Sequence, residues 1–101
     1  MLEINTKQEG DTTVVLLNGK LDVNAAMEAD KKFSEIGQAS SSVVLDCADL
    51  AYISSAGLRA FTRLRQILKK KDSPLILRHV KPEVMDVLDV TGLAARVTIE
   101  K

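Results

Sequence analysis

The chain has 101 residues, of which 46% are hydrophobic and 28% charged, with 14 basic and 14 acidic side chains. This length suits one packed core, so we expect residues 1–101 to form a single domain. A formal net charge of zero and only 3% aromatic residues disfavour nucleic acid and an anionic membrane surface as partners.

Targeting and redox signals are also sparse. No apolar run reaches the roughly 20 residues that cross a bilayer. The N-terminal residues lack the basic stretch and apolar core of a secretory signal. We therefore expect a cytoplasmic protein without membrane insertion. The single cysteine, Cys47, follows an apolar run, and we expect a buried, unreactive thiol.

The first elements predict a hairpin. Residues 2–7 alternate apolar and polar side chains, as a strand with one buried face does. Residues 9–11 form a turn, and residues 13–17 give a second, more apolar strand. The segment Gly19-Lys20-Leu21-Asp22 then interrupts the strand pattern.

A first amphipathic helix follows. Asp22 or Asn24 can cap its start, and Gly37 stands where a C-terminal glycine is expected. Its apolar positions fall at helical spacing: Ala25, Ala29, Phe33 and Ile36.

The middle of the chain predicts a central strand and a second helix. Val43-Val44-Leu45 is apolar on both faces, which favours a strand covered on both sides, and we expect residues 46–58 to contain the loop that follows. The helix begins near Ser55 and ends before Ser73-Pro74, with Lys69-Lys70-Lys71 at the negative end of its dipole. Its apolar stripe comprises Leu58, Phe61, Leu64, Ile67 and Leu68. The opposite face carries Arg59, Arg63, Gln66 and Lys70.

The remaining elements complete an α/β fold. Residues 75–77 form another fully apolar strand, and Pro82 fits the first turn of a third helix with Val84, Val87 and Leu88 buried. Gly92 ends this helix in the left-handed conformation, and a last strand contains Val97 and Ile99. The order β-β-α-β-α-β-α-β predicts a mixed sheet with helices packed against it.

Chemistry is expected where the central strand meets the second helix. Functional groups of open α/β sheets gather at the carboxyl ends of strands. Two hydroxyls, Ser54 and Ser55, stand there before the small residues Ala56 and Gly57. The unpaired N–H groups of a helix N-terminus accommodate a phosphate well. The alternative, which composition alone favours, is that Ser54 or Ser55 is only an ordinary helix cap.

Several segments stand in the order typical of a known family. They are Gly19-Lys20-Leu21-Asp22, Val44-Leu45-Asp46, Ile53-Ser54-Ser55-Ala56-Gly57-Leu58 and Val90-Thr91-Gly92-Leu93. Together they resemble the STAS domain, named after sulfate transporters and anti-sigma-factor antagonists, and the chain looks like a stand-alone antagonist. The resemblance covers essentially the whole chain.

The resemblance implies partner switching without catalysis by the chain itself. In such proteins the serine two before the glycine, here Ser55, is phosphorylated by an anti-sigma factor that is a serine kinase of histidine-kinase-like ATPase type. The unphosphorylated form binds that kinase and releases the sigma factor, and a serine phosphatase resets the phosphorylated form. No cofactor, metal or nucleic acid is implied. We expect the free protein to be a monomer.

The resemblance also bears on Asp22 and Ser54, which stand near Ser55. Asp22 matches the family's loop aspartate beside the serine and is equally well interpreted as a helix cap. Family members often carry aspartate immediately before the phosphorylated serine, where this chain has Ser54. Both hydroxyls are therefore candidates, and the glycine register favours Ser55. The family commonly has a further helix after its last strand, and contacts of that helix are not carried over.

The distribution of charge suggests one more contact. Arg59 lies four residues after Ser55, hence on nearly the same helix face, with Arg63 one turn further. We hypothesise that both arginines contact an acidic patch of the partner and that a phosphate on Ser55 pairs with Arg59. The predicted partner-binding residues are Asp22, Ser54, Ser55, Gly57 and Arg59.

Three alternatives remain open. A Ser-His-Asp hydrolase would need His79, the only histidine, and a glycine where Ile53 stands. Nucleic-acid binding would use residues 59–81, whose net charge is +7 against −7 elsewhere. The same domain could instead be a non-switching scaffold or a subunit of a stress-signalling or lipid-transport complex.

Overall fold

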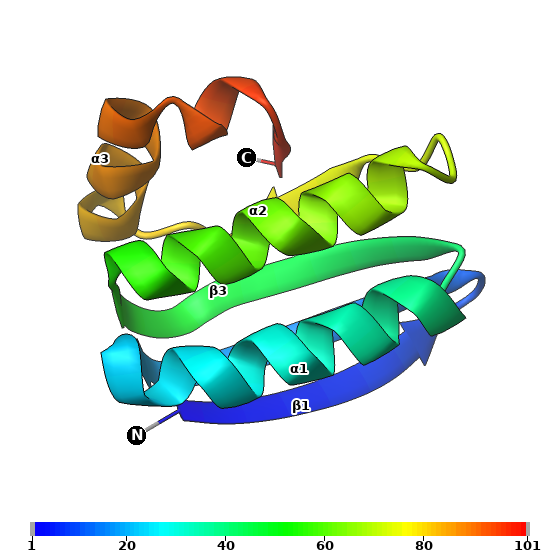
Figure 1. Cartoon of the computed structure of the whole chain (residues 1–101), viewed down its shortest axis with the longest axis horizontal. Helices are drawn as coiled ribbons and strands as arrows, with labels where there is room; N and C mark the ends of the chain where they lie inside the picture. The colour runs from blue at the N-terminus through cyan, green and yellow to red at the C-terminus, as the bar shows by residue number, and fades with distance from the viewer. Residues whose placement is uncertain (1, 101) are drawn as a thin grey trace.

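The computed structural model describes residues 2–100, which form one sheet of five strands with three α-helices (Figure 1). The strands are β1 (Leu2–Glu9), β2 (Thr12–Leu21), β3 (Ser42–Ile53), β4 (Leu75–Arg78) and β5 (Thr98–Glu100). The helices are α1 (Val23–Ala39), α2 (Ser55–Lys69) and α3 (Pro82–Thr91), followed by the short 3-10 helix η1 (Leu93–Ala95). The α/β fold class and the order of elements are confirmed.

The sheet is mixed, as expected. Its strands lie in the order β1-β2-β3-β4-β5. β1 and β2 are antiparallel because a short turn joins them, whereas the other neighbours are parallel and are joined through helices. β2 and β3 run in the same direction, and the last residues of both, Leu21 and Ile53, are paired. The carboxyl ends of these two strands therefore meet at one edge, where α1 and α2 begin.

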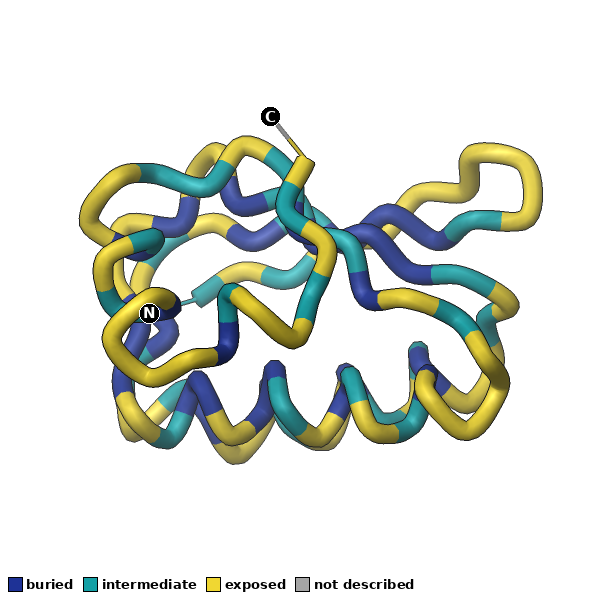
Figure 2. Tube along the Cα trace, turned by 90° about the horizontal axis from the view of Figure 1, so that it is seen from above, coloured by how far each residue is buried: buried dark blue, intermediate teal, exposed yellow. Residues whose placement is uncertain are grey.

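All three helices pack on one face of the sheet. α1 and α2 lie side by side over the strands (Figure 1), and the long helices form a layer on one side of the sheet (Figure 2). The shared core contains alternate residues of the central strands together with buried side chains of each helix. Its members include Val15, Leu17, Val43, Leu45, Leu75, Leu77, Phe33, Phe61, Leu64, Val84 and Leu88. Phe33 of α1 and Phe61 of α2 meet with ring centroids 5.8 Å apart.

The prediction that the central strand is covered on both sides is confirmed, since Val43, Val44 and Leu45 are all buried, but helices lie on one face only. Val44 is buried, but it lies on the other face of the sheet, in register with Val14 and Ile76. Arg78 shares that face, and its guanidinium lies 3.9 Å from Glu9 and 3.0 Å from Glu100. Val44 is thus buried on the face of the sheet opposite to the one on which the helices pack.

Two predicted boundaries also need correction. β2 continues through residues 19–21, and β3 extends through residues 46–53, which the sequence pattern assigns to a loop. The two strands stay paired along this stretch, with register shifts between Leu16 and Asn18 and between Gly19 and Lys20. Such bulges break the alternation of side chains that would reveal a strand in the sequence.

Gly37 does not end α1, because the helix continues to Ala39. Gly37 is buried against α2, and a Cβ atom at this position would lie 2.8 Å from Leu64 Cδ1. The actual end of α1 is held by Lys71, whose Nζ donates to the carbonyl oxygens of Gly37, Gln38 and Ser40 at 2.7, 2.8 and 3.1 Å. Lys71 thus satisfies carbonyl groups that the end of a helix leaves free.

The other helix predictions are confirmed in outline. The apolar stripe of α2 is buried except at Ile67, which is half-buried. Pro82 stands in the first turn of α3, and Gly92 ends that helix with φ 81°. Leu93 is buried and joins the core. Among residues 2–100, no helix is both long and apolar enough to cross a membrane.

Candidate functional site at the start of α2

The paired ends of β2 and β3 position the starts of two helices. The Ser54 N–H donates to the Leu21 carbonyl oxygen at 2.9 Å, which joins the two strand ends. Asp22 then caps α1, since its Oδ1 accepts from the Ala25 N–H at 2.9 Å. Ser54 caps α2, and its Oγ accepts from the Gly57 N–H at 3.1 Å. The predicted residues Asp22, Ser54 and Ser55 therefore gather at one edge of the sheet.

The two adjacent hydroxyls differ in exposure. Ser54 is only 6% exposed, and its hydroxyl is used in the cap. Ser55, the first residue of α2, is exposed. Of the two serines, Ser55 is therefore the one whose hydroxyl a second protein can reach.

Asp22 has the capping role that the sequence allowed. Its carboxylate accepts a hydrogen bond at the start of α1, and its neighbour Leu21 is bonded to Ser54. The resemblance also implies that the Asp22 carboxylate lies beside the phosphorylated serine. A carboxylate that caps α1 can have this second role as well.

Gly57 has a packing role. The position is buried, and a Cβ atom there would lie 2.6 Å from Leu21 Cγ and 3.0 Å from Ile53 Cγ1. Gly57 is among the predicted partner-binding residues, but Leu21 and Ile53 occupy the space beside it and the position is buried. The glycine instead lets α2 start close to the ends of β2 and β3.

Ser55 lines a groove between α2 and the segment around η1. The groove has a volume of about 210 Å³ and is lined by Ser55, Leu58, Arg59, Thr62, Thr91, Leu93 and Arg96. Two guanidinium groups and two threonines thus share a groove with the exposed serine. A negatively charged group on Ser55 would find cationic side chains on the same surface.

Arg59 and Arg63 have different surroundings. Arg63 Nη1 forms an ion pair with Asp30 Oδ2 of α1 at 2.7 Å. Among residues 2–100, no carboxylate lies within ion-pair distance of Arg59, which is exposed. Arg63 thus has a carboxylate partner within the fold, and the hypothesis that both arginines contact an acidic patch of the partner stays a prediction.

His79 lies too far from the serines for a triad. Its Nδ1 is 3.2 Å from Asp46 Oδ1. Ser54 follows Asp46 by eight residues, nearly all of them in β3, and a strand rises about 3.3 Å per residue, so roughly 25 Å separates this pair from Ser54. A hydrolase that combines these groups is thereby excluded.

Cys47 is buried in β3, as expected. Burial, with a smaller contribution from the Asp46 carboxylate, raises the pKa of the Cys47 thiol to about 12. Since the thiolate is the reactive form, this thiol is inert at neutral pH. Within the described part of the chain, no cluster of three or more His, Cys, Asp or Glu side chains could hold a metal ion.

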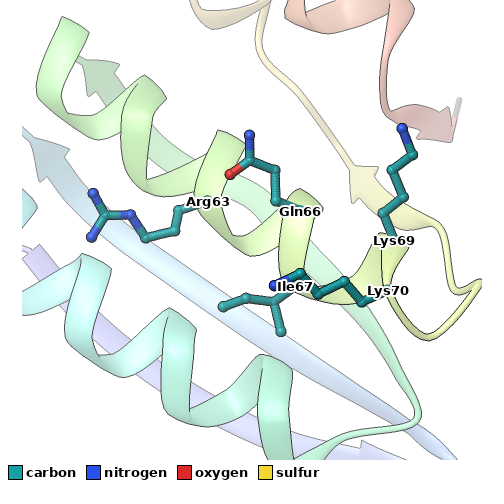
Figure 3. A pocket seen from close by; sticks show the side chains of 5 residues that line it. All are labelled: Arg63, Gln66, Ile67, Lys69 and Lys70. Atoms are coloured by element: carbon teal, nitrogen blue, oxygen red, sulfur yellow. The ribbon is translucent and has the colours of Figure 1, made fainter.

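A larger hollow lies over the C-terminal half of α2 (Figure 3). Its volume is about 570 Å³, and it is lined by Arg63, Gln66, Ile67, Lys69 and Lys70. Arg63 and Lys69 point in different directions, so these polar groups do not converge on a common point (Figure 3). Ser55 does not line this hollow, and the arrangement of its side chains does not indicate a catalytic or ligand-binding site.

A small mixed sheet with helices on one face and a serine at the start of α2 is typical of one family of small α/β domains. Residues 3–101 match the STAS domain, and the chain belongs to this family. It is 24% identical over 92 residues to the anti-sigma-B factor antagonist of Bacillus subtilis strain 168, which covers 91% of this chain and 84% of that protein.

Solved structures share the fold. An anti-sigma-factor antagonist (STAS) domain protein from Planctomyces limnophilus superposes with a TM-score of 0.86 at 18% identity, covering 100% of this chain and 91% of that one. The Bacillus cell fate determinant SpoIIAA in its phosphorylated form gives a TM-score of 0.76 at 20% identity, with 98% of this chain and 92% of that chain covered.

Proposed function

We propose that this protein is an anti-sigma-factor antagonist that acts by partner switching. Its unphosphorylated form binds an anti-sigma factor that is a serine kinase of histidine-kinase-like ATPase type, which frees the sigma factor. Phosphorylation of Ser55 abolishes this binding, and a serine phosphatase restores it. The observation that carries the proposal is the exposed Ser55 hydroxyl at the start of α2 beside a buried, capping Ser54.

The helix start explains how the site tolerates a phosphate. A phosphoserine carries about −1.5 to −2 charges at neutral pH. At the first position of α2 these charges face the positive end of the helix dipole, where N–H groups lack partners within the helix. The modification therefore changes the charge and shape of the surface without unfolding α2. A binding partner detects this change directly.

Arg59 makes the charge change larger. It stands one turn after Ser55 and lines the same groove. In the unphosphorylated form its guanidinium is available to a carboxylate of the kinase. A phosphate on Ser55 competes for it through a charge-assisted hydrogen bond. Phosphorylation thus adds negative charge at Ser55 and also makes the positive charge of Arg59 unavailable to the kinase.

Phosphorylation itself is tested with a purified anti-sigma factor of the histidine-kinase-like ATPase type that binds this protein. The purified protein is incubated with this kinase and ATP, and the modified residue is located by peptide mass spectrometry. We expect one phosphate, on Ser55, in the wild type and in Ser54→Thr, and none in Ser55→Ala. A phosphate on Ser54, or none on the wild type, contradicts the proposal.

Binding is measured with the same kinase and without ATP. We expect Ser55→Ala to retain the kinase and Ser55→Asp to lose it, because only the second variant adds negative charge at the helix start. Equal retention by both variants would favour the non-switching scaffold. In the cell we propose that the protein is a cytoplasmic monomer when free.

A further inference from the structure

Two apolar side chains stand out on the surface of α1. Val23 is 70% exposed and Met27 is 83% exposed. They are four residues apart, so they lie one above the other on the same helix face. Exposed apolar side chains are ordinary when scattered singly, whereas a neighbouring pair beside a groove indicates a contact surface.

These side chains border a groove between α1 and α2. It has a volume of about 270 Å³ and is lined by Val23, Ala26, Met27, Asp30, Ala56, Arg59, Ala60 and Arg63. We call it the α1–α2 groove. Its three alanines are short, so they leave room for a side chain from outside. Its apolar wall is formed by the two exposed residues of α1.

The groove adjoins the serine site. Ala56 follows Ser55 directly, and Arg59 lines both the α1–α2 groove and the groove that contains Ser55. The charge of Arg63 is balanced by Asp30 at 2.7 Å, whereas Arg59 has no such partner among residues 2–100. The groove is therefore apolar with one unbalanced positive charge at the edge nearer Ser55.

We infer that the α1–α2 groove receives an apolar side chain of the anti-sigma factor, with a carboxylate of the same protein placed against Arg59. This inference rests on the proposed function, since the occupant is the kinase that binds Ser55. The apolar contact supplies affinity that phosphorylation does not alter. The contact at Arg59 is the part that a phosphate on Ser55 removes.

The apolar contact is tested with substitutions that keep size and charge. Val23→Thr and Met27→Gln exchange apolar groups for polar ones of similar shape, and both residues are exposed, so the fold loses little buried area. Val90→Thr is the matched control, because Val90 is 87% exposed but lines neither groove. Affinity for the purified anti-sigma factor is measured by calorimetry, and thermal unfolding checks that all variants are folded.

We expect the Val23→Thr/Met27→Gln double variant to bind at least tenfold more weakly and Val90→Thr to change the Kd less than twofold. Phosphorylation of Ser55 in the double variant should still release the kinase. If the wild type binds and Ser55→Asp does not, but the double variant binds normally, the groove is not part of the interface while the proposed function stands. Absence of binding by the wild type would overturn both.

Discussion

Ser54 and Ser55 are neighbours with separate physical roles. The Ser54 Oγ holds the Gly57 N–H within the protein, whereas Ser55 faces the solvent. Loss of an N-cap hydroxyl costs typically about 1 kcal/mol, and substitutions at exposed positions away from special contacts stay within about 0.5 kcal/mol. We therefore expect Ser54→Ala to lower the free energy of unfolding by about 1 kcal/mol and Ser55→Ala to leave it nearly unchanged, as measured by urea unfolding.

A third variant separates the cap from other effects at the same position. Aspartate is as good a cap as serine, and its charge suits the start of a helix. Ser54→Asp should therefore recover most of the stability that Ser54→Ala loses. If Ser55→Ala were the more destabilising change, the assignment of the cap to Ser54 would be wrong.

At this scale the sequence indicated the candidate site but not all of the contacts within it. The helix start at Ser54 and Ser55 was predictable because capping patterns are local, and the choice of Ser55 came from the resemblance to the family. The burial of Gly57 depends on Leu21, which precedes it by 36 residues in the sequence and which no local pattern connects with it. The pairing of Arg63 with Asp30 is equally non-local.

At the scale of elements, two glycines let helices approach their neighbours. Gly57 sets the distance from α2 to the ends of β2 and β3, and Gly37 sets the distance between α1 and α2. The nearest atom to an added Cβ differs in kind. At Gly57 it is the branching Cγ of Leu21, at 2.6 Å, and at Gly37 it is the terminal methyl Cδ1 of Leu64, at 2.8 Å. A terminal methyl group moves aside more easily than a branch point near the backbone.

Alanine at each glycine tests this difference. Both changes favour the helix by up to about 1 kcal/mol, and overpacking opposes them by about 1–3 kcal/mol. We expect Gly57→Ala to lose about 1–2 kcal/mol and Gly37→Ala to stay within about 1 kcal/mol of the wild type in urea unfolding. Equal losses, or a larger loss at Gly37, would show that the branch point of Leu21 does not limit the packing of α2.

The sequence could not foresee where α1 ends. A glycine after an apolar stripe is the usual sign of a helix end, yet Gly37 lies inside α1 because α2 packs against it. Lys71, 31 residues after Ser40, then holds the free carbonyl groups at the end of α1. The periodicity of apolar residues shows which face of a helix is buried. Where the helix ends depends also on the neighbouring element that packs against that face.

At the scale of the whole molecule, the concentrated positive charge of residues 59–81 is partly used within the fold. Arg63 pairs with Asp30, Arg78 with Glu100, and Lys71 binds the carbonyl groups of α1. Arg65 donates to the Arg96 carbonyl oxygen. The asymmetry of charge along the sequence is therefore a weaker argument for nucleic-acid binding than the net charge of residues 59–81 suggests.

The order of the elements was predictable because each element carries its own apolar pattern.

Arg59 and Arg96 line the Ser55 groove, and neither forms an ion pair among residues 2–100. Of the two, Arg59 lies on the same helix as Ser55, and its reversal tests whether a charge at this place acts locally. Arg59→Glu should weaken binding of the unphosphorylated protein to the anti-sigma factor about tenfold or more, equivalent to about 1.4 kcal/mol, and reduce the salt dependence of the affinity. Lys70→Glu is the control, since Lys70 is also exposed and caps the same helix. It stands eleven residues further, or about 16 Å at 1.5 Å per residue, and should change the Kd less than twofold. Equal weakening by both variants would mean that the kinase responds to overall charge, and no weakening by either would remove Arg59 from the interface.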